Sequence, residues 1–359
     1  MHITGIQLKN FRCFKEFNIT FDRPVILLEG ANGTGKTSVL EALHYACYLR
    51  SFRTHSPQEL TYFDQNSFFV KITLADQDLQ QHEIKIGFSG KKRAVKINQK
   101  NIVSYKELMD YYRIVTLTED DLSLIKEGPE QRRMFIDQVI MLYDADFALL
   151  IKKLRYTVDS RNALFRQSNS QEYYDFWSRE LWDVSHAIRQ KRTVALAELE
   201  KEVQELLATH FPQDILISFA YQEKKGGNES SFEDFLDNQP LLYQSELHMG
   251  RSLFGAHLDD FAIHFKQQRS RAFASRGQQK LIVLLLKIAQ IKNLLARKAV
   301  RPILLLDDFM TDLDEDRSNQ LIDVLKNLNC QLIFTCPINN SSLLQKLESL
   351  NFQRLIVTH

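Results

Sequence analysis

The sequence lacks the features that would place it in a membrane, an oxidising compartment or a zinc protein. Its four cysteines form no Cys-x-x-Cys pair, and no cluster of His and Cys has zinc-site spacing. The longest apolar run, Leu281 to Leu286, is broken by Lys287, so no segment can span a bilayer. The first residues do not form a signal peptide. We therefore expect reduced core thiols and a cytoplasmic protein without a membrane partner.

The chain also lacks a large excess of one charge, internal repeats and low-complexity tracts. Its formal net charge is +1 over 359 residues, so any nucleic-acid surface must be a local patch. Hydrophobic content of 44% and charged content of 25% are ordinary for a globular protein. The length accommodates two domains, or one large domain with an insertion.

What the sequence does contain is a phosphate-loop motif at residues 30–38, which read Gly, four residues, Gly-Lys, then Thr-Ser. The motif follows the apolar stretch 24–28 and precedes a good helix former, 39–46. In this arrangement backbone N–H groups and a helix N-terminus converge on phosphate oxygens, which argues against a mere glycine-rich turn. The expected nucleotide contacts are Gly30, Ala31, Asn32, Gly33, Thr34, Gly35, Lys36, Thr37 and Ser38.

Two side chains of the loop and two later carboxylates have expected roles. Lys36 would reach the β- and γ-phosphates of ATP, and the Thr37 hydroxyl would bind Mg²⁺. The apolar strand 303–306 ends in Asp307 and Asp308. Asp307 would bind Mg²⁺, and Asp308 would orient and deprotonate the attacking water. Two turn-forming aspartates in solvent are the alternative, which the phosphate loop disfavours.

The remaining pattern divides the chain into α/β parts and a helical part. Expected strands are 3–8, 17–21, 68–74, 83–88, 94–97, 303–306, 331–335 and 355–358. From Pro129 to His210 apolar residues recur at helical spacing, which predicts two long helices joined by a turn at 167–171. Later helices are expected at 280–295, 315–327 and 340–350, and a loop at 224–228.

Ser275 stands just before Gly277, Gln278 and the apolar helix 280–295. It is well placed to cap that helix. The same geometry would aim a hydroxyl and a positive helix end at an anion.

The order of these motifs resembles the ABC-type ATPases of the SMC group, and finer motifs resemble the RecF family of bacterial recombination-repair ATPases. The finer motifs are Asn10-Phe11-Arg12, Leu40-Glu41-Ala42, Ser51-Phe52-Arg53-Thr54, Gly128-Pro129-Glu130-Gln131-Arg132-Arg133 with Phe135 and Asp137, Leu304 to Asp308, and 313–314. Three segments depart from the family pattern. Residues 255–260 read Gly-Ala-His-Leu-Asp-Asp instead of Gly-Pro-His-Arg-Asp-Asp, Arg276 replaces a glutamine, and 119–122 read Glu-Asp-Asp-Leu instead of Pro-Glu-Asp-Leu.

The resemblance implies an α/β fold, an ABC-type P-loop ATPase head with an inserted α-helical lobe. The head would comprise residues 1–137 and 246–359, and the lobe 138–245. Arg12, Gly277 and Gln278 would also contact nucleotide, and Ser275 would complete the catalytic site of a second copy. The cofactors would be ATP and Mg²⁺.

By the same resemblance, the activity would be weak, DNA-stimulated ATP hydrolysis in DNA repair, replication and the SOS response. An ATP-dependent homodimer would bind double-stranded and gapped DNA, and would act with the RecO and RecR proteins to help load RecA. The alternatives are an ABC transporter subunit, which the helical insertion and the Asp-Asp strand end disfavour, and a nuclease-associated ATPase, which would need a further acidic domain.

The densest basic cluster lies in the hairpin predicted from strands 83–88 and 94–97. Lys91, Lys92 and Arg93 would lie near its tip, where they could contact DNA phosphates without reading bases. A solvated hairpin that its charges keep soluble stays an open alternative.

Overall fold

The computed structural model describes residues 1–359 apart from 77, 103–106, 109–110, 167–170, 212–214, 226–228, 230, 298–300, 309–314, 339–340, 349 and 359. At 315–317, 341–343 and 346 it describes the backbone alone. The chain forms two compact units. Unit 1 comprises 1–122, 209–211 and 276–359, and unit 2 comprises 123–208 and 212–275.

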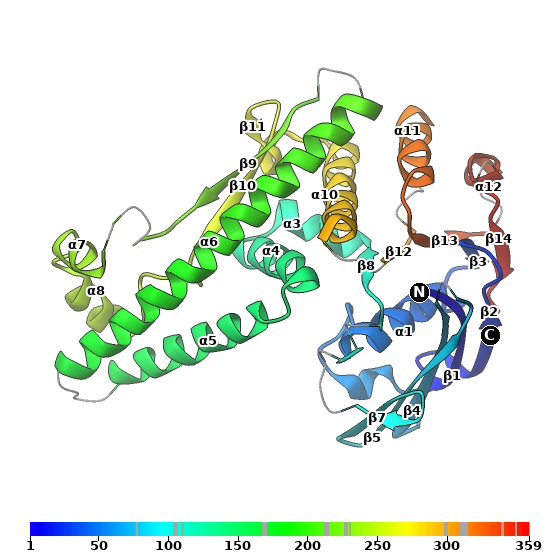
Figure 1. The fold of residues 1–359 in the computed structure, drawn as a ribbon, viewed down its shortest axis with the longest axis horizontal. Coiled ribbons are helices and arrows are strands. Elements are labelled where there is room, and N and C mark those ends of the chain that lie inside the picture. Colours follow the sequence, from blue (N-terminus) through cyan, green and yellow to red (C-terminus); the bar gives the residue numbers. More distant parts are fainter. Residues whose placement is uncertain are drawn as a thin grey trace. The chain divides into compact units, whose positions relative to one another are not determined.

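Unit 1 contains a parallel sheet whose central strands are mostly apolar and buried. Within the described residues its order is β14-β3-β13-β12-β8, with β14 at Gln353–Ile356, β3 at Val25–Gly30, β13 at Gln331–Pro337, β12 at Ile303–Leu306 and β8 at Ile114–Leu117. β3 and β12 are buried throughout, as expected of parallel strands covered on both faces. Helices accompany this sheet: α1 at Lys36–Tyr48, α10 at Arg276–Arg297, α11 at Glu315–Lys326 and α12 at Ser341–Glu348 (Figure 1).

The second sheet of unit 1 is antiparallel. Its order is β2-β1-β4-β5-β6-β7, with β1 at His2–Phe11, β2 at Phe14–Thr20, β4 at Ser67–Ala75, β5 at Gln81–Ser89, β6 at Lys92–Ile97 and β7 at Lys100–Asn101. Short 3₁₀ helices lie at Pro57–Leu60 (η1) and Glu119–Leu122 (η2). α1 lies between the two sheets, since Val39 and Leu43 share one core with Ile6 of β1 and Ile26 of β3.

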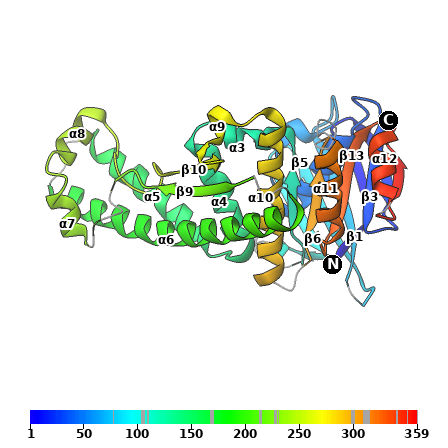
Figure 2. The ribbon, with the colours of Figure 1, turned by 90° about the horizontal axis from the view of Figure 1, so that it is seen from above.

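Unit 2 is built on two long helices, α5 (Phe147–Leu164) and α6 (Gln171–His210), which run side by side (Figure 1 and Figure 2). Its other elements are α3 at Ser123–Lys126, α4 at Pro129–Tyr143, β9 at Ile217–Gln222, α7 at Phe232–Asp237, α8 at Leu242–Met249, β10 at Asp260–Phe265, β11 at Gln268–Arg269 and α9 at Ser270–Phe273. β9, β10 and β11 form a small antiparallel sheet. None of the helices that the structure describes combines the length and apolar character needed to cross a membrane.

The helical unit is larger than the sequence pattern indicates. Its boundaries fall at 122/123 and 275/276, whereas we expected 137/138 and 245/246. One ion pair and one hydrogen bond account for the first of these differences. Arg132 donates from Nε and Nη2 to the Asp260 carboxylate at 2.7 and 3.0 Å, and Arg133 donates to the backbone carbonyl oxygen of Asp259 at 2.7 Å. These bonds join α4 to β10 inside unit 2.

Most predicted elements are confirmed within a few residues, with the last strand two residues earlier than expected. The strands β7, β8, β9, β10 and β11 were not predicted. The expected turn at 167–171 and the expected loop at 224–228 fall mostly outside the described residues.

Candidate functional site

Parallel strands bring the predicted site residues to one edge of a sheet. β3 ends at Gly30, β12 ends directly before Asp307, and β13 lies between them. Because the strands are parallel, their carboxyl ends meet at the same edge. Ligands of open α/β sheets bind outside this edge.

Close packing explains the glycines of the phosphate loop. A Cβ on Gly30 would lie 2.4 Å from Thr34 Oγ1, and a Cβ on Gly35 would lie 2.4 Å from Phe14 Cζ. Gly33 and Gly35 also have φ values of +86° and +94°, a left-handed conformation that favours glycine. The loop therefore keeps its backbone N–H groups close to any phosphate that it holds.

Lys36 is buried at the first position of α1. Its Nζ donates to the carbonyl oxygens of Gly30 at 3.0 Å and Ala31 at 3.1 Å. These bonds hold the ammonium group over the loop, while Ala31, Asn32 and Gly33 stay exposed. Phosphate oxygens can replace the two carbonyl acceptors, which is the arrangement that a nucleotide needs.

Thr37 and Asp307 meet, although 270 residues separate them. Thr37 Oγ1 donates to Asp307 Oδ1 at 3.0 Å. A hydroxyl and a carboxylate are the hard oxygen ligands that Mg²⁺ takes in nucleotide sites, with the remaining positions left to water and phosphates. The described part of the chain contains no group of three or more His, Cys, Asp or Glu that could hold a metal ion. Water and phosphate oxygens would therefore have to complete the coordination of Mg²⁺. The residues therefore fit Mg²⁺ bound together with a nucleotide.

Sequence reasoning missed Thr335, which lies in β13 between the two strand ends. Its Oγ1 donates to Asp307 Oδ1 at 2.8 Å and accepts from the Asp308 N–H at 2.9 Å. The Asp308 carboxylate lies 3.4 Å from the same hydroxyl, and φ of Asp308 is +45°. Thr335 thus fixes the positions of both carboxylates. The alignment of the predicted strand 331–335 beside 303–306 is the signal that could have found it.

The electrostatics of Asp307 favour a bound cation. Burial raises the pKa of Asp307, and the neighbouring Asp308 carboxylate raises it further. Hydrogen bonds from Thr335 and Thr37, and the nearby Arg53, act in the opposite direction. A divalent ion beside Asp307 would stabilise the ionised carboxylate, because an opposite charge favours the charged form.

Arg12 is bound to the helix that follows the loop. Its Nε and Nη2 donate to the buried Glu41 carboxylate at 2.7 and 2.6 Å, and Nη1 donates to the Glu59 carbonyl oxygen at 2.8 Å. Ser51 also donates to Glu41, and Arg53 lies 3.6 Å from it. Glu41 therefore binds residues of two motifs that resemble the family, Asn10-Phe11-Arg12 and Ser51-Phe52-Arg53-Thr54. A nucleotide contact for Arg12 stays a prediction.

Ser275 directly precedes α10, and Gly277 and Gln278 lie in the first turn of that helix. Two of the departures from the family pattern meet here, since Arg276 Nη2 lies 3.1 Å from the Glu119 carboxylate. Glu119 also pairs with the buried Lys280 at 2.7 Å. The acidic η2 and the basic side chains of α10 thus compensate each other, while the roles of Ser275, Gly277 and Gln278 stay predictions.

The predicted basic hairpin is present as β5 and β6. Lys91 and Lys92 are exposed, and Arg93 is exposed but donates from Nη1 to the Leu49 carbonyl oxygen at 2.9 Å. Lys85 pairs with Glu83, which removes it from the cluster. The exposure and bonds of these side chains do not test whether they contact DNA, so a DNA contact by Lys91, Lys92 and Arg93 stays a prediction.

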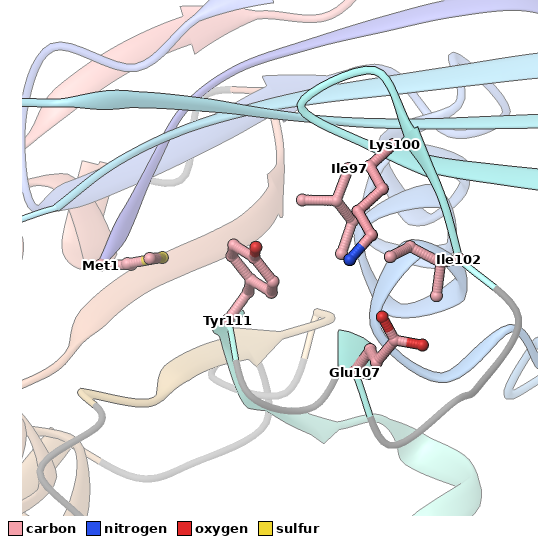
Figure 3. A pocket seen from close by; sticks show the side chains of 6 residues that line it. All are labelled: Met1, Ile97, Lys100, Ile102, Glu107 and Tyr111. Atoms are coloured by element: carbon pink, nitrogen blue, oxygen red, sulfur yellow. The ribbon is translucent and has the colours of Figure 1, made fainter.

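A pocket of about 380 Å³ lies elsewhere in unit 1 (Figure 3). Its lining residues are Met1, Ile97, Lys100, Ile102, Glu107 and Tyr111. None of them belongs to the phosphate loop or to the carboxylate pair, so this pocket is not the nucleotide site.

Comparisons with known proteins agree with this geometry. A profile of the AAA domain matches residues 6–349. The chain is 29% identical to the DNA replication and repair protein RecF of Clostridium acetobutylicum, over 94% of this chain and 93% of that protein. It is 28% identical to RecF of Acholeplasma laidlawii, over 96% of this chain and 97% of that protein.

Solved structures are also similar. A structure of the recombination mediator protein RecF with ATP has a TM-score of 0.83 and 25% identity, covering 94% of this chain and 92% of that one. The Smc head domain of Pyrococcus furiosus, at 16% identity and a TM-score of 0.56, shares the fold and covers 96% of this chain and 91% of that one.

The phosphate loop, the paired carboxylates and these folds define an ABC-type P-loop ATPase head with a helical lobe, as expected from the sequence. The chain belongs to the AAA-domain family, and over nearly its whole length it is similar to the DNA replication and repair protein RecF.

Proposed function

We propose that this protein binds DNA in an ATP-dependent way during recombinational repair and replication-fork maintenance. In this proposal ATP joins two copies at duplex or gapped DNA, and the assembly helps RecO and RecR to load RecA. The observation that carries the ATPase part is the meeting of Lys36, Thr37 and Asp307 at one sheet edge. The DNA-repair part is supported by the RecF relatives and by the RecF–ATP structure, which favour it over the transporter and nuclease alternatives.

The chain's own residues suit phosphoryl transfer to water. Lys36 would exchange its two carbonyl acceptors for β- and γ-phosphate oxygens. Thr37 and Asp307 would hold Mg²⁺, which supplies charge neutralisation at the phosphates. Asp308, fixed through its N–H by Thr335, would hold the attacking water and accept its proton.

The test separates binding from hydrolysis. Lys36→Ala should lose tight ATP binding, because the charge that faces the phosphates is gone. Asp308→Asn should bind ATP but hydrolyse it more slowly by about 10²–10⁴, the usual contribution of a general base. Calorimetry with ATP and single-turnover hydrolysis measure the two effects.

Asp323→Asn is a matched control, because Asp323 is an exposed carboxylate of α11 that pairs with Lys326. It should behave as the wild type does. Full ATP affinity in Lys36→Ala, or normal turnover in Asp308→Asn, would contradict the assignment of the site. A wild-type protein that hydrolyses ATP but binds no DNA would contradict the DNA part alone.

A further inference from the structure

The tip of the β5–β6 hairpin is fastened to the C-terminal end of α1. Arg93 Nη1 donates to the carbonyl oxygen of Leu49 at 2.9 Å. Leu49 is the C-cap of α1, with φ of +53°, and its own N–H donates to the Tyr45 carbonyl oxygen at 2.7 Å. A cation at this helix end is favourable, because the last carbonyl groups of a helix carry partial negative charge. Arg93 therefore has a structural partner that its sequence position did not reveal.

Two more bonds hold the same tip. The Gly90 N–H donates to the Asn66 carbonyl oxygen at 3.0 Å, and Gln58 Nε2 donates to the Gly90 carbonyl oxygen at 3.1 Å. The tip is thus joined to three segments of unit 1, namely the end of α1, η1 and the start of β4. Such a tip presents its exposed side chains in a fixed position, which lowers the entropy cost of binding a partner.

The exposed cations at this place are Lys91 and Lys92 on the hairpin and Arg50 directly after Leu49. Within the described residues none of the three forms an ion pair. Lys85 and Lys71 of the same sheet differ, because both pair with Glu83. Arg50 and Lys92 are the chain neighbours of Leu49 and Arg93, so the Arg93–Leu49 bond keeps their backbones near one end of the hairpin. Side chains alternate along β6, so Lys92 lies on the sheet face opposite that of Arg93. Uncompensated, exposed charge of one sign is the feature that attracts backbone phosphates.

We propose that Arg50, Lys91 and Lys92 form one surface that holds the backbone phosphates of duplex DNA, and that Arg93 couples this surface to the nucleotide site. The proposal rests on the DNA-binding function proposed above and gives it a place and a link to ATP. Binding at this surface should not depend on the base sequence, because its three cations would contact backbone phosphates and not base edges.

The link runs through α1. This helix begins with Lys36 and Thr37 at the phosphate loop and ends beside Leu49, so its 13 residues join the two places over about 20 Å. Glu41, in the same helix, holds Arg12 and the Ser51 loop. Phosphates bound at the fixed tip would therefore act, through the Arg93–Leu49 bond, on the end of the element that carries the nucleotide ligands. Arg93 is the positioning residue in this scheme, whereas Arg50, Lys91 and Lys92 touch the DNA.

The two roles predict two different losses in the full-length protein. The triple variant Arg50→Ala, Lys91→Ala, Lys92→Ala should shrink the slope of log affinity against log salt by roughly 3. The reason is that each neutralised phosphate contributes about 0.9 to this slope. Arg93→Ala should keep the slope but lose the stimulation of ATP hydrolysis by DNA. Fluorescence anisotropy with a labelled duplex over a salt series, and ATPase rates with and without the duplex, measure the two effects.

Conservative variants separate these roles from misfolding. Arg50→Lys keeps the charge and should keep the salt slope, and Lys326→Ala, a surface lysine of α11, should keep both slope and stimulation. An unchanged slope in the triple variant, while the wild type binds DNA, overturns the surface. A slope that falls by about 1 in Arg93→Ala, with stimulation retained, makes Arg93 a phosphate ligand and overturns the coupling. Wild-type protein that binds no DNA overturns the proposed function instead.

Discussion

At the scale of single residues, two glycines of the phosphate loop share a backbone conformation but differ in their surroundings. Gly33 and Gly35 have φ values of +86° and +94°, which cost an L-residue about 1–2 kcal/mol. A Cβ on Gly33 meets no atom within 4 Å, whereas a Cβ on Gly35 lies 2.6 Å from Cys13 Sγ and 2.4 Å from Phe14 Cζ. We expect Gly35→Ala to abolish ATP binding, because the loop must move away from the β1–β2 turn. Calorimetric titration with ATP tests this.

Gly33→Ala is the matched control. It carries the same conformational cost without the clash, so its ATP affinity should fall by no more than about 5- to 30-fold. Equal losses in the two variants would show that backbone conformation, and not packing against Cys13 and Phe14, decides the effect.

His44 gives the stability of the fold a pH dependence. Burial lowers the pKa of His44 to about 3, with Lys287 and Arg50 adding to the effect, and its Nδ1 lies 2.8 Å from Thr116 Oγ1. The unfolded chain, with a His pKa near 6.5, takes up the proton first as pH falls, so this contribution is lost from about pH 6.5 downward. Between pH 7 and 5 the loss is about 2 kcal/mol.

Urea unfolding at pH 7 and pH 5 measures that loss. In His44→Gln the difference between the two pH values should be smaller by the same amount, because glutamine does not titrate. An identical pH dependence in both proteins would exclude His44 as its source.

At the scale of helices and strands, the sequence predicts those elements whose own residues show a clear hydrophobic pattern. The apolar run of α10 and the buried strand β12 were predicted close to their observed bounds. β9 was missed, because the six residues Ile217–Gln222 become a strand through pairing with β10, which lies beyond two further helices in the chain. Strand propensity of so short a segment depends on its neighbours.

Some residues of the candidate site can likewise be predicted from the sequence, whereas others cannot. Lys36, Thr37 and Asp307 belong to motifs whose spacing the sequence displays, and the structure brings them together. Thr335 and the Arg12–Glu41 pair could not be derived from spacing, because their roles depend on strand order and on helix orientation.

The elements of unit 2 are joined by a buried ion pair whose removal should be costly. Arg161 of α5 donates to Glu246 of α8 at 2.8 and 2.6 Å, and both side chains are 0% exposed. Arg161→Met would leave the Glu246 carboxylate buried without its partner, which costs about 3–5 kcal/mol. We expect the free energy of unfolding of the helical unit to fall by that amount, as measured by urea unfolding.

The exposed pair Arg179–Glu233 supplies the comparison. Arg179→Met should leave the unfolding transition close to that of the wild type, because solvent already screens both charges. If Arg161→Met and Arg179→Met have similar effects, the Arg161–Glu246 pair does not hold α5 and α8 together.

At the scale of the whole molecule, the proposed dimer requires one site to be built from two copies. Ser275 precedes α10, whose N-terminal end carries the partial positive charge that suits a phosphate. In the proposed assembly this end would face the γ-phosphate held by Lys36 of the partner subunit. Ser275→Arg should then leave ATP binding nearly intact, because the phosphate loop is untouched, while it blocks dimerisation and hydrolysis.

Mixing variants distinguishes a shared site from a site within one copy. A pair formed by Ser275→Arg and Lys36→Ala has one site with both groups intact, made from the phosphate loop of the first and the serine of the second. Each variant alone should be inactive, and the mixture should regain part of the wild-type rate. If Ser275 acted on the nucleotide of its own copy, every site in the mixture would lack one group and no activity would return. Sedimentation velocity in saturating ATP gives the independent measurement, since a wild-type protein that stays monomeric there has no shared site for the mixture to restore.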